Sequence, residues 1–440
     1  MNSGKKAIWG WAFYDWANSA FATTVIAGFF PVFFKQYWSE GADANLSTAQ
    51  LGLGNALAGL VMALLAPLLG AVADRTSARK RFLIFFAYLG VLSTAGLFLV
   101  DRGNWALAIF TFAMGNIGFS GANVFYDALL PRVAPPERID AVSSLGYSLG
   151  YLGGGLLFAF NVLMTLMPQR FGLPDAAAAV QWSFVTVALW WGGFTIFTIL
   201  WVPEQRAPAA ALSPLAALAE GWHRLRSTLR TIGRFKPALI FLLAYWCYID
   251  GVDTIIRMAV DYGLSLGFPS TDLITALLIV QFVGFPAALV FGRLGQRWGP
   301  RPAIFLAIGV YMGVTVWGAL MTHRLEFYFM AVVIGLVQGG IQALSRSYYA
   351  RLIPPERTAE FFGFYNMLGK FASILGPALM GVVGLLVRRA LMPAAPVAEE
   401  LIRVGQTASR WSIASILILF GIGAVLLYFV DPKAAREPPS

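Results

Sequence analysis

The sequence predicts an all-α integral membrane protein whose twelve transmembrane helices form two pseudo-symmetric bundles of six. The composition is the first observation: 58% of the 440 residues are hydrophobic and only 12% are charged, about half the charged share of a soluble domain. The second is that apolar runs of about 20 residues, the length needed to cross the hydrocarbon core, recur along the whole chain. The third is that short blocks of the first half return in the second half.

The apolar runs define the expected helices in chain order. They lie near 9–36, 50–72, 82–100, 105–127, 142–164, 180–202, 237–264, 272–292, 302–321, 327–348, 361–386 and 411–430. The first run is too long and too polar for a secretory signal, because it carries Asp15 and Asn18. We therefore expect an N-terminal bundle at 1–202, a cytoplasmic linker at 203–236, a C-terminal bundle at 237–430 and a cytoplasmic tail at 431–440.

The charged residues of the loops set the expected orientation. With both termini in the cytoplasm, most of the 32 Lys and Arg residues fall on the cytoplasmic side, as the positive-inside rule requires. The net charge of +10 is then explained by topology, and nucleic acid is not an expected partner. Residues 215–230 of the linker alternate apolar and basic positions, which indicates an amphipathic helix on the inner leaflet; a solvated linker helix is the alternative.

Residue counts exclude several classes of site. The single cysteine, Cys247, rules out a disulfide framework, and two histidines leave no zinc-ligand cluster. We expect neither a cofactor nor a metal, and no enzymatic activity. The expected protein is a monomer in a bacterial inner membrane, in contact with membrane lipids.

The internal repeat is strongest around a Pro-Pro-Glu-Arg block. Residues 135–138 recur as residues 354–357, and at the same offset Gly121 corresponds to Gly340, and Arg132 to Arg351. Several matches in register across two spans and a loop indicate a duplication. Asp127 and Arg346 are repeat partners of opposite sign near the cytoplasmic ends of their spans. We expect them to be gate or packing charges.

A second repeated block follows the second and eighth spans. Gly70-Ala-Val-Ala-Asp74-Arg75 with Arg79-Lys80 parallels residues 292–297 with Arg301. The first copy resembles the signature of the major facilitator superfamily. The resemblance implies two six-helix halves around a central cavity, with Gly70, Asp74, Arg75 and Arg79 in a latch on the cytoplasmic side. Gln296 replaces the acid in the second copy, so a weaker latch is expected there.

Three further blocks carry a narrower resemblance. Phe13-Tyr-Asp-Trp-Ala-Asn-Ser-Ala-Phe21, Asn123-Val-Phe-Tyr-Asp-Ala-Leu-Leu-Pro131 and Gly146-Tyr-Ser-Leu-Gly-Tyr-Leu-Gly-Gly154 are similar to the autophagy-related vacuole effluxer-like family of facilitators. For this chain the resemblance implies a transporter, and the fungal members imply export of amino acids from the vacuole.

Ionisable residues lie inside the seventh span. At about 100° per residue, Asp250, Asp253, Arg257 and Asp261 share one helix face. A charge that faces lipid at the bilayer centre costs about 3 kcal/mol even on the lenient insertion scale. We therefore expect this face to contact protein or water. A structural ion pair of Arg257 with its acidic neighbours is the alternative to a binding role.

The same reasoning selects polar residues in other spans. The candidate substrate- or proton-binding residues are Asp15, Asn18, Asn123, Asp250, Asp253, Arg257, Gln338, Gln342 and Lys370. Lys370 fits a substrate carboxylate or an acid of the seventh span equally well. Acids and bases together in one cavity suit a zwitterion such as an amino acid, and a buried Asp suits proton coupling.

The predicted function is therefore secondary active transport of a small polar solute by alternating access, coupled to protons. Efflux of amphipathic compounds is the nearest alternative. The first and seventh spans, which hold candidate binding residues, also carry aromatic residues such as Trp11, Trp16, Tyr245 and Trp246. A lipid flippase and a sensor that no longer transports are also compatible with the pattern. A membrane-embedded enzyme is disfavoured, because the sequence holds no His, Cys or metal-binding constellation to support it.

Overall fold

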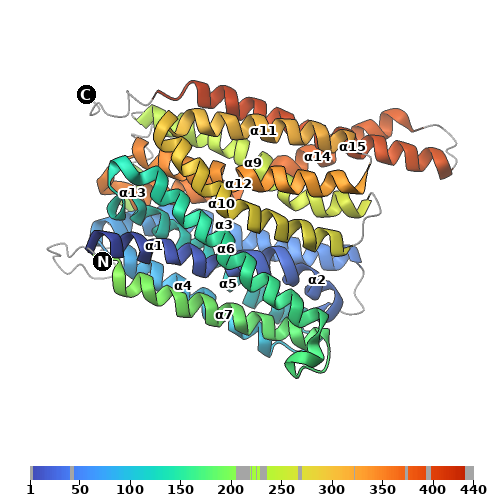
Figure 1. The fold of residues 1–440 in the computed structure, drawn as a ribbon, viewed down its shortest axis with the longest axis horizontal. Coiled ribbons are helices and arrows are strands. Elements are labelled where there is room, and N and C mark those ends of the chain that lie inside the picture. Colours follow the sequence, from blue (N-terminus) through green and yellow to red (C-terminus); the bar gives the residue numbers. More distant parts are fainter. Residues whose placement is uncertain are drawn as a thin grey trace.

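The structure is a computed structural model, and it describes residues 3–39, 44–204, 219, 221–223, 225–227, 235–265, 270–321, 323–371, 375–392 and 398–431. These residues form helices joined by short turns, and no strand occurs among them. The long helices lie side by side, and the first helix begins and the last helix ends at the same end of the molecule (Figure 1). We call this end the terminal end and the opposite end the far end.

The N-terminal bundle contains the first six spans. They are α1 (Ser3–Ala20) with its continuation η1 (Phe21–Phe29), α2 (Phe30–Phe33) and η2 (Phe34–Trp38), then α3 (Ala44–Thr76), α4 (Arg79–Gly96) with η3 (Leu97–Leu99), α5 (Trp105–Val133), α6 (Ile139–Leu166) and α7 (Ala176–Trp201). The first span changes from an α-helix to a π-helix at Phe21. Such wide turns are rare and occur often at functional sites.

The C-terminal bundle repeats this order. Its spans are α9 (Lys236–Ser265), α10 (Ser270–Trp298), α11 (Pro300–Leu320), α12 (Arg324–Leu352), the pair α13 (Thr358–Phe371) and α14 (Leu375–Leu391), and α15 (Ala398–Tyr428). The Pro-Pro-Glu-Arg blocks form matching 3-10 turns, η4 (Pro136–Arg138) and η7 (Pro355–Arg357), each before a span. The two bundles therefore share their turn chemistry as well as their helix order.

Most helix boundaries agree with the apolar runs to within about six residues, but α15 begins at Ala398, well before the predicted start at residue 411. Within the described residues, eleven helices are long and apolar enough to cross a membrane. The predicted span at 361–386 corresponds to the shorter pieces α13 and α14, between which residues 372–374 are not described. The predicted linker helix falls mostly outside the described residues, but Leu225 is buried there. The predicted tail beyond Asp431 is likewise not described.

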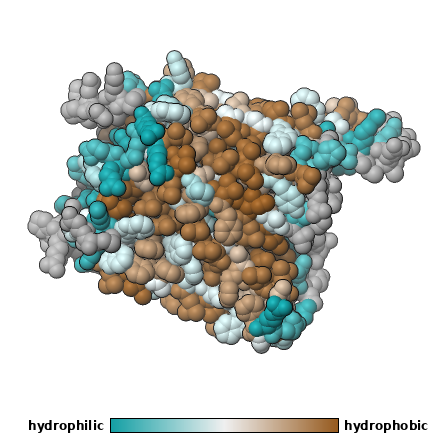
Figure 2. Space-filling view, viewed as in Figure 1, coloured by the Kyte–Doolittle hydropathy of each residue, from teal (hydrophilic) through white to brown (hydrophobic). Residues whose placement is uncertain are grey.

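An apolar band crosses the middle of the molecule. Figure 2 shows hydrophobic residues across the centre and hydrophilic residues toward the two ends. Large apolar side chains of the outer helices α4, α7, α11 and α15 are exposed, including Leu92, Leu189 and Val425. An apolar middle with exposed large side chains is typical of a protein surrounded by lipid.

The two bundles contact each other mainly toward the terminal end. The helix α3 packs against α13, and α6 packs against α10 and α12. Small residues allow these close crossings: a Cβ atom on Gly70 would lie 2.2 Å from the carbonyl oxygen of Ala359, and one on Gly363 would lie 2.7 Å from that of Ala66. On the opposite flank, a Cβ atom on Gly292 would lie 2.7 Å from the Ser144 side chain.

Candidate functional site

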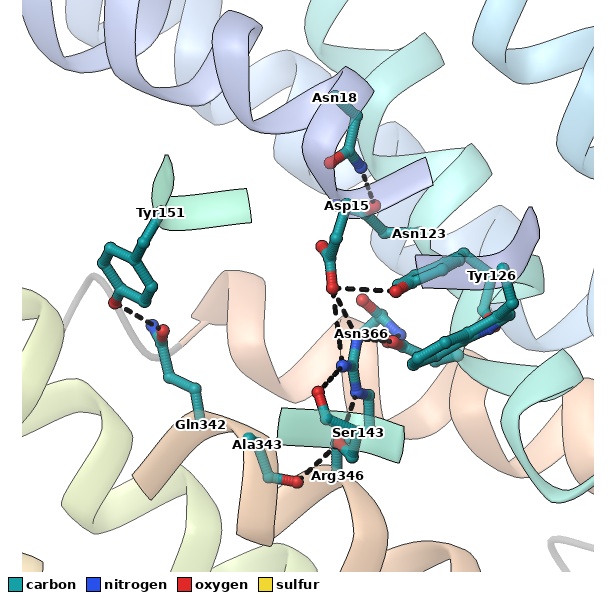
Figure 3. A network of polar contacts seen from close by, with 12 residues as sticks. Asp15, Asn18, Asn123, Tyr126, Ser143, Tyr151, Gln342, Ala343, Arg346 and Asn366 are labelled. Atoms are coloured by element: carbon teal, nitrogen blue, oxygen red, sulfur yellow. Dashed lines mark hydrogen bonds and ion pairs between the residues drawn. The ribbon is translucent and has the colours of Figure 1, made fainter. Parts of the chain in front are cut away.

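The guanidinium of Arg346, on α12, lies at the centre of a buried polar junction between the bundles (Figure 3). Its Nη1 lies 3.2 Å from Asp127 Oδ1 and 3.4 Å from Asp15 Oδ2. It also donates from Nη2 to the carbonyl oxygen of Ser143 at 2.8 Å, and from Nε to the Ser143 hydroxyl at 3.0 Å. Arg346 is only 1% exposed, so its charge depends on these partners for stabilisation.

Three aromatic rings complete the surroundings of Arg346. The guanidinium carbon lies 4.3 Å from the centre of the Tyr147 ring, 4.8 Å from Trp11 and 5.2 Å from Tyr126. All three distances are within the range of cation–π attraction. Trp11 and Tyr126 stack on each other at 4.4 Å, and the Trp11 indole donates to the Tyr126 carbonyl oxygen. The rings therefore form a rigid wall beside the charge.

The acids of the junction have partners besides Arg346. The Tyr126 hydroxyl donates to Asp15 Oδ2 at 2.7 Å, and Asn366, on α13, donates to Asp127 Oδ2 at 3.0 Å. The sequence pattern places Asp15 with the binding residues, and Asp127 and Arg346 with the gate residues. The structure brings all three together at one point.

Two other polar contacts extend the junction toward the far end. The Asn18 amide donates to the Asn123 side chain at 2.6 Å, which joins α1 to α5 inside the N-terminal bundle. The Tyr151 hydroxyl donates to Gln342 at 3.2 Å, which joins α6 to α12 across the two bundles. Gln338 lies one turn before Gln342 on α12.

The seventh span, α9, places its acids differently. Asp250 is fully buried and accepts from the backbone N–H groups of Leu375 at 3.0 Å and Gly376 at 2.8 Å. These are the first two residues of α14, so the carboxylate lies where helix N-termini favour negative charge. The Thr254 hydroxyl donates to the same carboxylate at 3.2 Å. Asp250 thus caps a helix of its own bundle.

The remaining candidates of spans seven and eleven are placed less fully. Asp253 is half-buried and lies one turn after Asp250 on α9. Arg257 and Lys370 belong to α9 and α13, but their side chains lie outside the described part of the structure.

The first latch block joins the bundles at the terminal end. Asp74, at the end of α3, pairs with Arg79 at 2.6 Å and accepts from the N–H groups of Ala359 at 3.1 Å and Glu360 at 2.9 Å, which open α13. Arg79 also reaches the carbonyl oxygen of Glu356 at 3.4 Å. Asp74 therefore caps a helix of the other bundle, whereas Arg75 is exposed at the end of α3.

The second copy of the latch has a different geometry. Arg301, the counterpart of Arg79, donates to the carbonyl oxygen of Tyr428 within its own bundle. The link between bundles on this flank is made instead by Arg351 and Asp140, whose charged atoms lie 2.5 Å apart. Asp140 is absent from the residues that sequence reasoning selects. Its signal was its position two residues after the Pro-Pro-Glu-Arg block, where α6 begins.

A cavity of about 290 Å³ lies in the far half of the molecule. It is enclosed mainly by α9, α10, α11, α12 and α15, and the first span reaches it through Ala22, Thr23 and Ala27. The polar side chains among its described lining are Thr23, Gln281, Thr315 and Gln338; the other lining residues are apolar or glycine. Gln281 donates to Thr23 at 3.4 Å, so the cavity is also a contact between the bundles.

Sequence comparison relates the chain to known transporters. The family described as "Vacuole effluxer Atg22 like" matches residues 3–51 and 47–384. The MFS-type transporter YxiO of Bacillus subtilis is 38% identical over 433 residues, which cover 97% of this chain and 95% of that protein. Autophagy-related protein 22 of Coccidioides immitis is 22% identical over 554 residues, which cover 98% of this chain and 87% of that protein.

Solved structures with the same fold are transporters of the major facilitator superfamily. The human organic anion transporter MFSD10 superposes with a TM-score of 0.67 at 14% identity, over 96% of this chain and all of that chain. The proton:xylose symporter XylE has the same TM-score at 15% identity, over 98% of this chain and 95% of that chain. The chain belongs to the Atg22-like vacuole effluxer family of the major facilitator superfamily, and it is a multi-pass membrane transporter.

Proposed function

We propose that this transporter moves a small polar solute by alternating access, coupled to protons. The observation that carries the proposal is the buried junction at Arg346, where one guanidinium from the C-terminal bundle lies between Asp15 and Asp127 of the N-terminal bundle. Contacts of this kind close one end of the molecule while a cavity remains in the other half. Alternating access then requires the junction to break and the bundles to rock against each other.

Proton coupling is supported by the charges of the junction. Two carboxylates face one guanidinium, so the three side chains carry one surplus negative charge when all are ionised. Binding of one proton to Asp15 or Asp127 brings them to neutrality, and it weakens the attraction that holds the bundles together. A proton can thereby favour the state that is open at the terminal end.

The class of solute follows from groups of both signs in the interior. Arg346, Asp15 and Asp127 are buried inside the helical assembly, and polar amides of Gln281 and Gln338 line the cavity. These groups suit a zwitterion such as an amino acid. Efflux of an amphipathic compound is a second candidate, because most of the cavity lining is apolar.

The proposed setting is a bacterial inner membrane, with both termini in the cytoplasm and the protein acting as a monomer. The distribution of Lys and Arg supports this orientation. The terminal end is then the cytoplasmic end. The latch formed by Asp74 and Arg79 closes that side, and the cavity lies toward the outer face.

A direct test starts with a thermal-shift screen of purified protein against amino acids, peptides, sugars and drugs. Each compound that raises the melting temperature is then followed in proteoliposomes with and without an imposed pH gradient. Accumulation of the compound that depends on the gradient is the expected result. Uptake that is unaffected by the gradient would contradict proton coupling, and flux of drugs alone would favour the second candidate.

A further inference from the structure

We propose that the pocket which holds the Arg346 guanidinium is itself a binding site for a cationic group of the transported solute. The group would be a guanidinium or a primary ammonium, and it would enter when Arg346 leaves. We call this pocket the cation cage: it comprises Trp11, Asp15, Tyr126, Asp127, Ser143 and Tyr147. The inference rests on the proposed transport function, since it assigns the solute class of the same protein.

Every described contact to the Arg346 guanidinium comes from the N-terminal bundle. The two carboxylates belong to α1 and α5, and Ser143, with its carbonyl and hydroxyl oxygens, belongs to α6. The three rings come from the same three helices. The C-terminal bundle supplies Arg346 and two further contacts to the cage: Asn366 donates to Asp127 Oδ2 at 3.0 Å, and the carbonyl oxygen of Ala343 accepts from the Ser143 hydroxyl at 2.7 Å. Separation of the bundles at the terminal end therefore removes the cation and these two contacts, while the six residues of the cage stay together on the N-terminal bundle.

The cage is built before any ligand arrives. The Asp15 carboxylate is held by the Tyr126 hydroxyl at 2.7 Å, and the Tyr126 ring is held by Trp11. Glycine at position 146 allows α6 to approach α1, since a Cβ atom there would lie 2.7 Å from both Asp15 Oδ2 and the Tyr126 hydroxyl. These supports all lie within the N-terminal bundle, so they do not depend on the position of Arg346.

The charges favour replacement of one cation by another. When Arg346 leaves, Asp15 and Asp127 remain with two negative charges at a weakly hydrated site, which is costly. A cation from the solute restores the balance that Arg346 provided. The rings and acids favour a flat, weakly hydrated cation, and guanidinium matches both its shape and its hydrogen-bond donors.

The test measures a distance across the terminal end in a protein whose cage residues are all unchanged. Spin labels at Arg81 and Pro355, one in each bundle, are introduced into a Cys247→Ser protein reconstituted in liposomes. Methylguanidinium is compared with methylurea, a neutral compound of similar shape, and arginine is compared with citrulline. We expect each cation to lengthen the distance between the labels and each neutral partner to leave it unchanged.

Variants locate the effect in the cage. Trp11→Leu or Tyr147→Leu should weaken the response to methylguanidinium by about 2- to 30-fold, the range expected for loss of one cation–π contact. Trp9→Leu is the matched control, because Trp9 is on the same helix and packs against Phe13 outside the cage. Arg346→Ala, where it folds, should gain melting temperature with methylguanidinium at millimolar concentration and none with methylurea.

The outcomes separate this inference from the proposed function. Equal changes in the label distance with methylguanidinium and methylurea would overturn the cage proposal. No change with either compound, together with uptake of a neutral solute driven by a pH gradient, would also overturn it. This second result would leave the transport proposal standing. A response to cations with no flux of any solute would support the cage and overturn the transport proposal. Gradient-driven uptake of arginine but not citrulline supports both.

Discussion

Asp127 and Arg346 occupy equivalent positions in the two halves of the repeat, and their charged atoms lie 3.2 Å apart. Two residues related by a pseudo-twofold axis can touch only if both lie close to that axis, as in a symmetric dimer interface. Identical charges at this point would repel each other. The divergence to opposite signs after duplication therefore converts a point of contact into an ion pair that joins the bundles.

The ion pair predicts a large effect for Arg346→Ala. Its removal leaves Asp15 and Asp127 buried without their common partner, and loss of one member of a buried ion pair typically costs about 3–5 kcal/mol of unfolding free energy. Arg346→Lys should be intermediate, because an ammonium cannot make the same set of contacts. Chemical unfolding of the purified variants in detergent measures both, and a loss for Arg346→Ala well below that of a buried ion pair, under about 1 kcal/mol, would contradict the account.

The surplus charge predicts that the two acids set the proton dependence. Asp15→Asn and Asp127→Asn should each retain folding but lose accumulation driven by a pH gradient, because one carboxylate and the guanidinium remain as a balanced pair. Solute exchange without a gradient should persist in part. The measurement is uptake in proteoliposomes with and without the gradient, and full gradient-driven accumulation in both variants would exclude these residues as the proton site.

The close crossing of α3 and α13 predicts a difference between two glycines of one helix. Gly70→Ala should hinder closure at the terminal end, because its Cβ atom would lie 2.2 Å from the Ala359 carbonyl oxygen; overpacking of this kind costs about 1–3 kcal/mol. A Cβ atom on Gly59 meets no atom within 4 Å, so Gly59→Ala is the control. Cysteine crosslinking between α3 and α13 reports the closure, and equal yields in both variants would contradict the prediction.

The contacts of Asp250 predict a structural rather than a proton-binding role. Asp250→Ala should lower the unfolding free energy by about 1–2 kcal/mol through loss of the cap on α14. Asp250→Asn keeps an oxygen that can accept from Leu375 or Gly376, and it should preserve gradient-driven transport by the folded protein. If Asp250→Asn folds normally and loses only its proton-driven accumulation, Asp250 is a proton site after all.

Much of the fold could be predicted from the sequence because lipid penalises polar groups so strongly. The span boundaries and the interior position of Asp15, Asp127 and Asp250 all follow from that cost. The repeat offset also shows that Asp127 and Arg346 occupy the same position in their two copies. The span boundaries and the buried acids can be predicted from one helix at a time, and the repeat correspondence from the alignment of the two copies. Such predictions do not require the rotation of each helix about its own axis.

The composition of the junction could not be predicted in the same way. Trp11, Tyr126 and Tyr147 belong to spans rich in aromatic residues, so nothing in the sequence distinguishes them from ordinary packing residues. Their role depends on the rotation of three helices about their axes. The contact of Asp250 with α14 was also out of reach, because it requires the position at which another span begins a new helix.

The latches show a related limit. The Gly-Asp-Arg spacing draws attention to the residues around Asp74, and the replacement of the acid by Gln296 predicts a weaker latch in the second copy. The position of Asp140 after the Pro-Pro-Glu-Arg block marks the start of α6, but nothing in the sequence pairs it with Arg351 across the bundles. A salt bridge between residues of different bundles leaves no spacing pattern along the chain.

The most direct test of the central claim is the distance between spin labels at Arg81 and Pro355, measured by pulsed electron resonance in the Cys247→Ser protein and in its Arg346→Lys derivative. If the junction holds the bundles together at the terminal end, the first protein should give mainly the short distance and the derivative should shift toward a longer one. Unchanged distances in a folded derivative that no longer transports would contradict the claim that Arg346 controls closure.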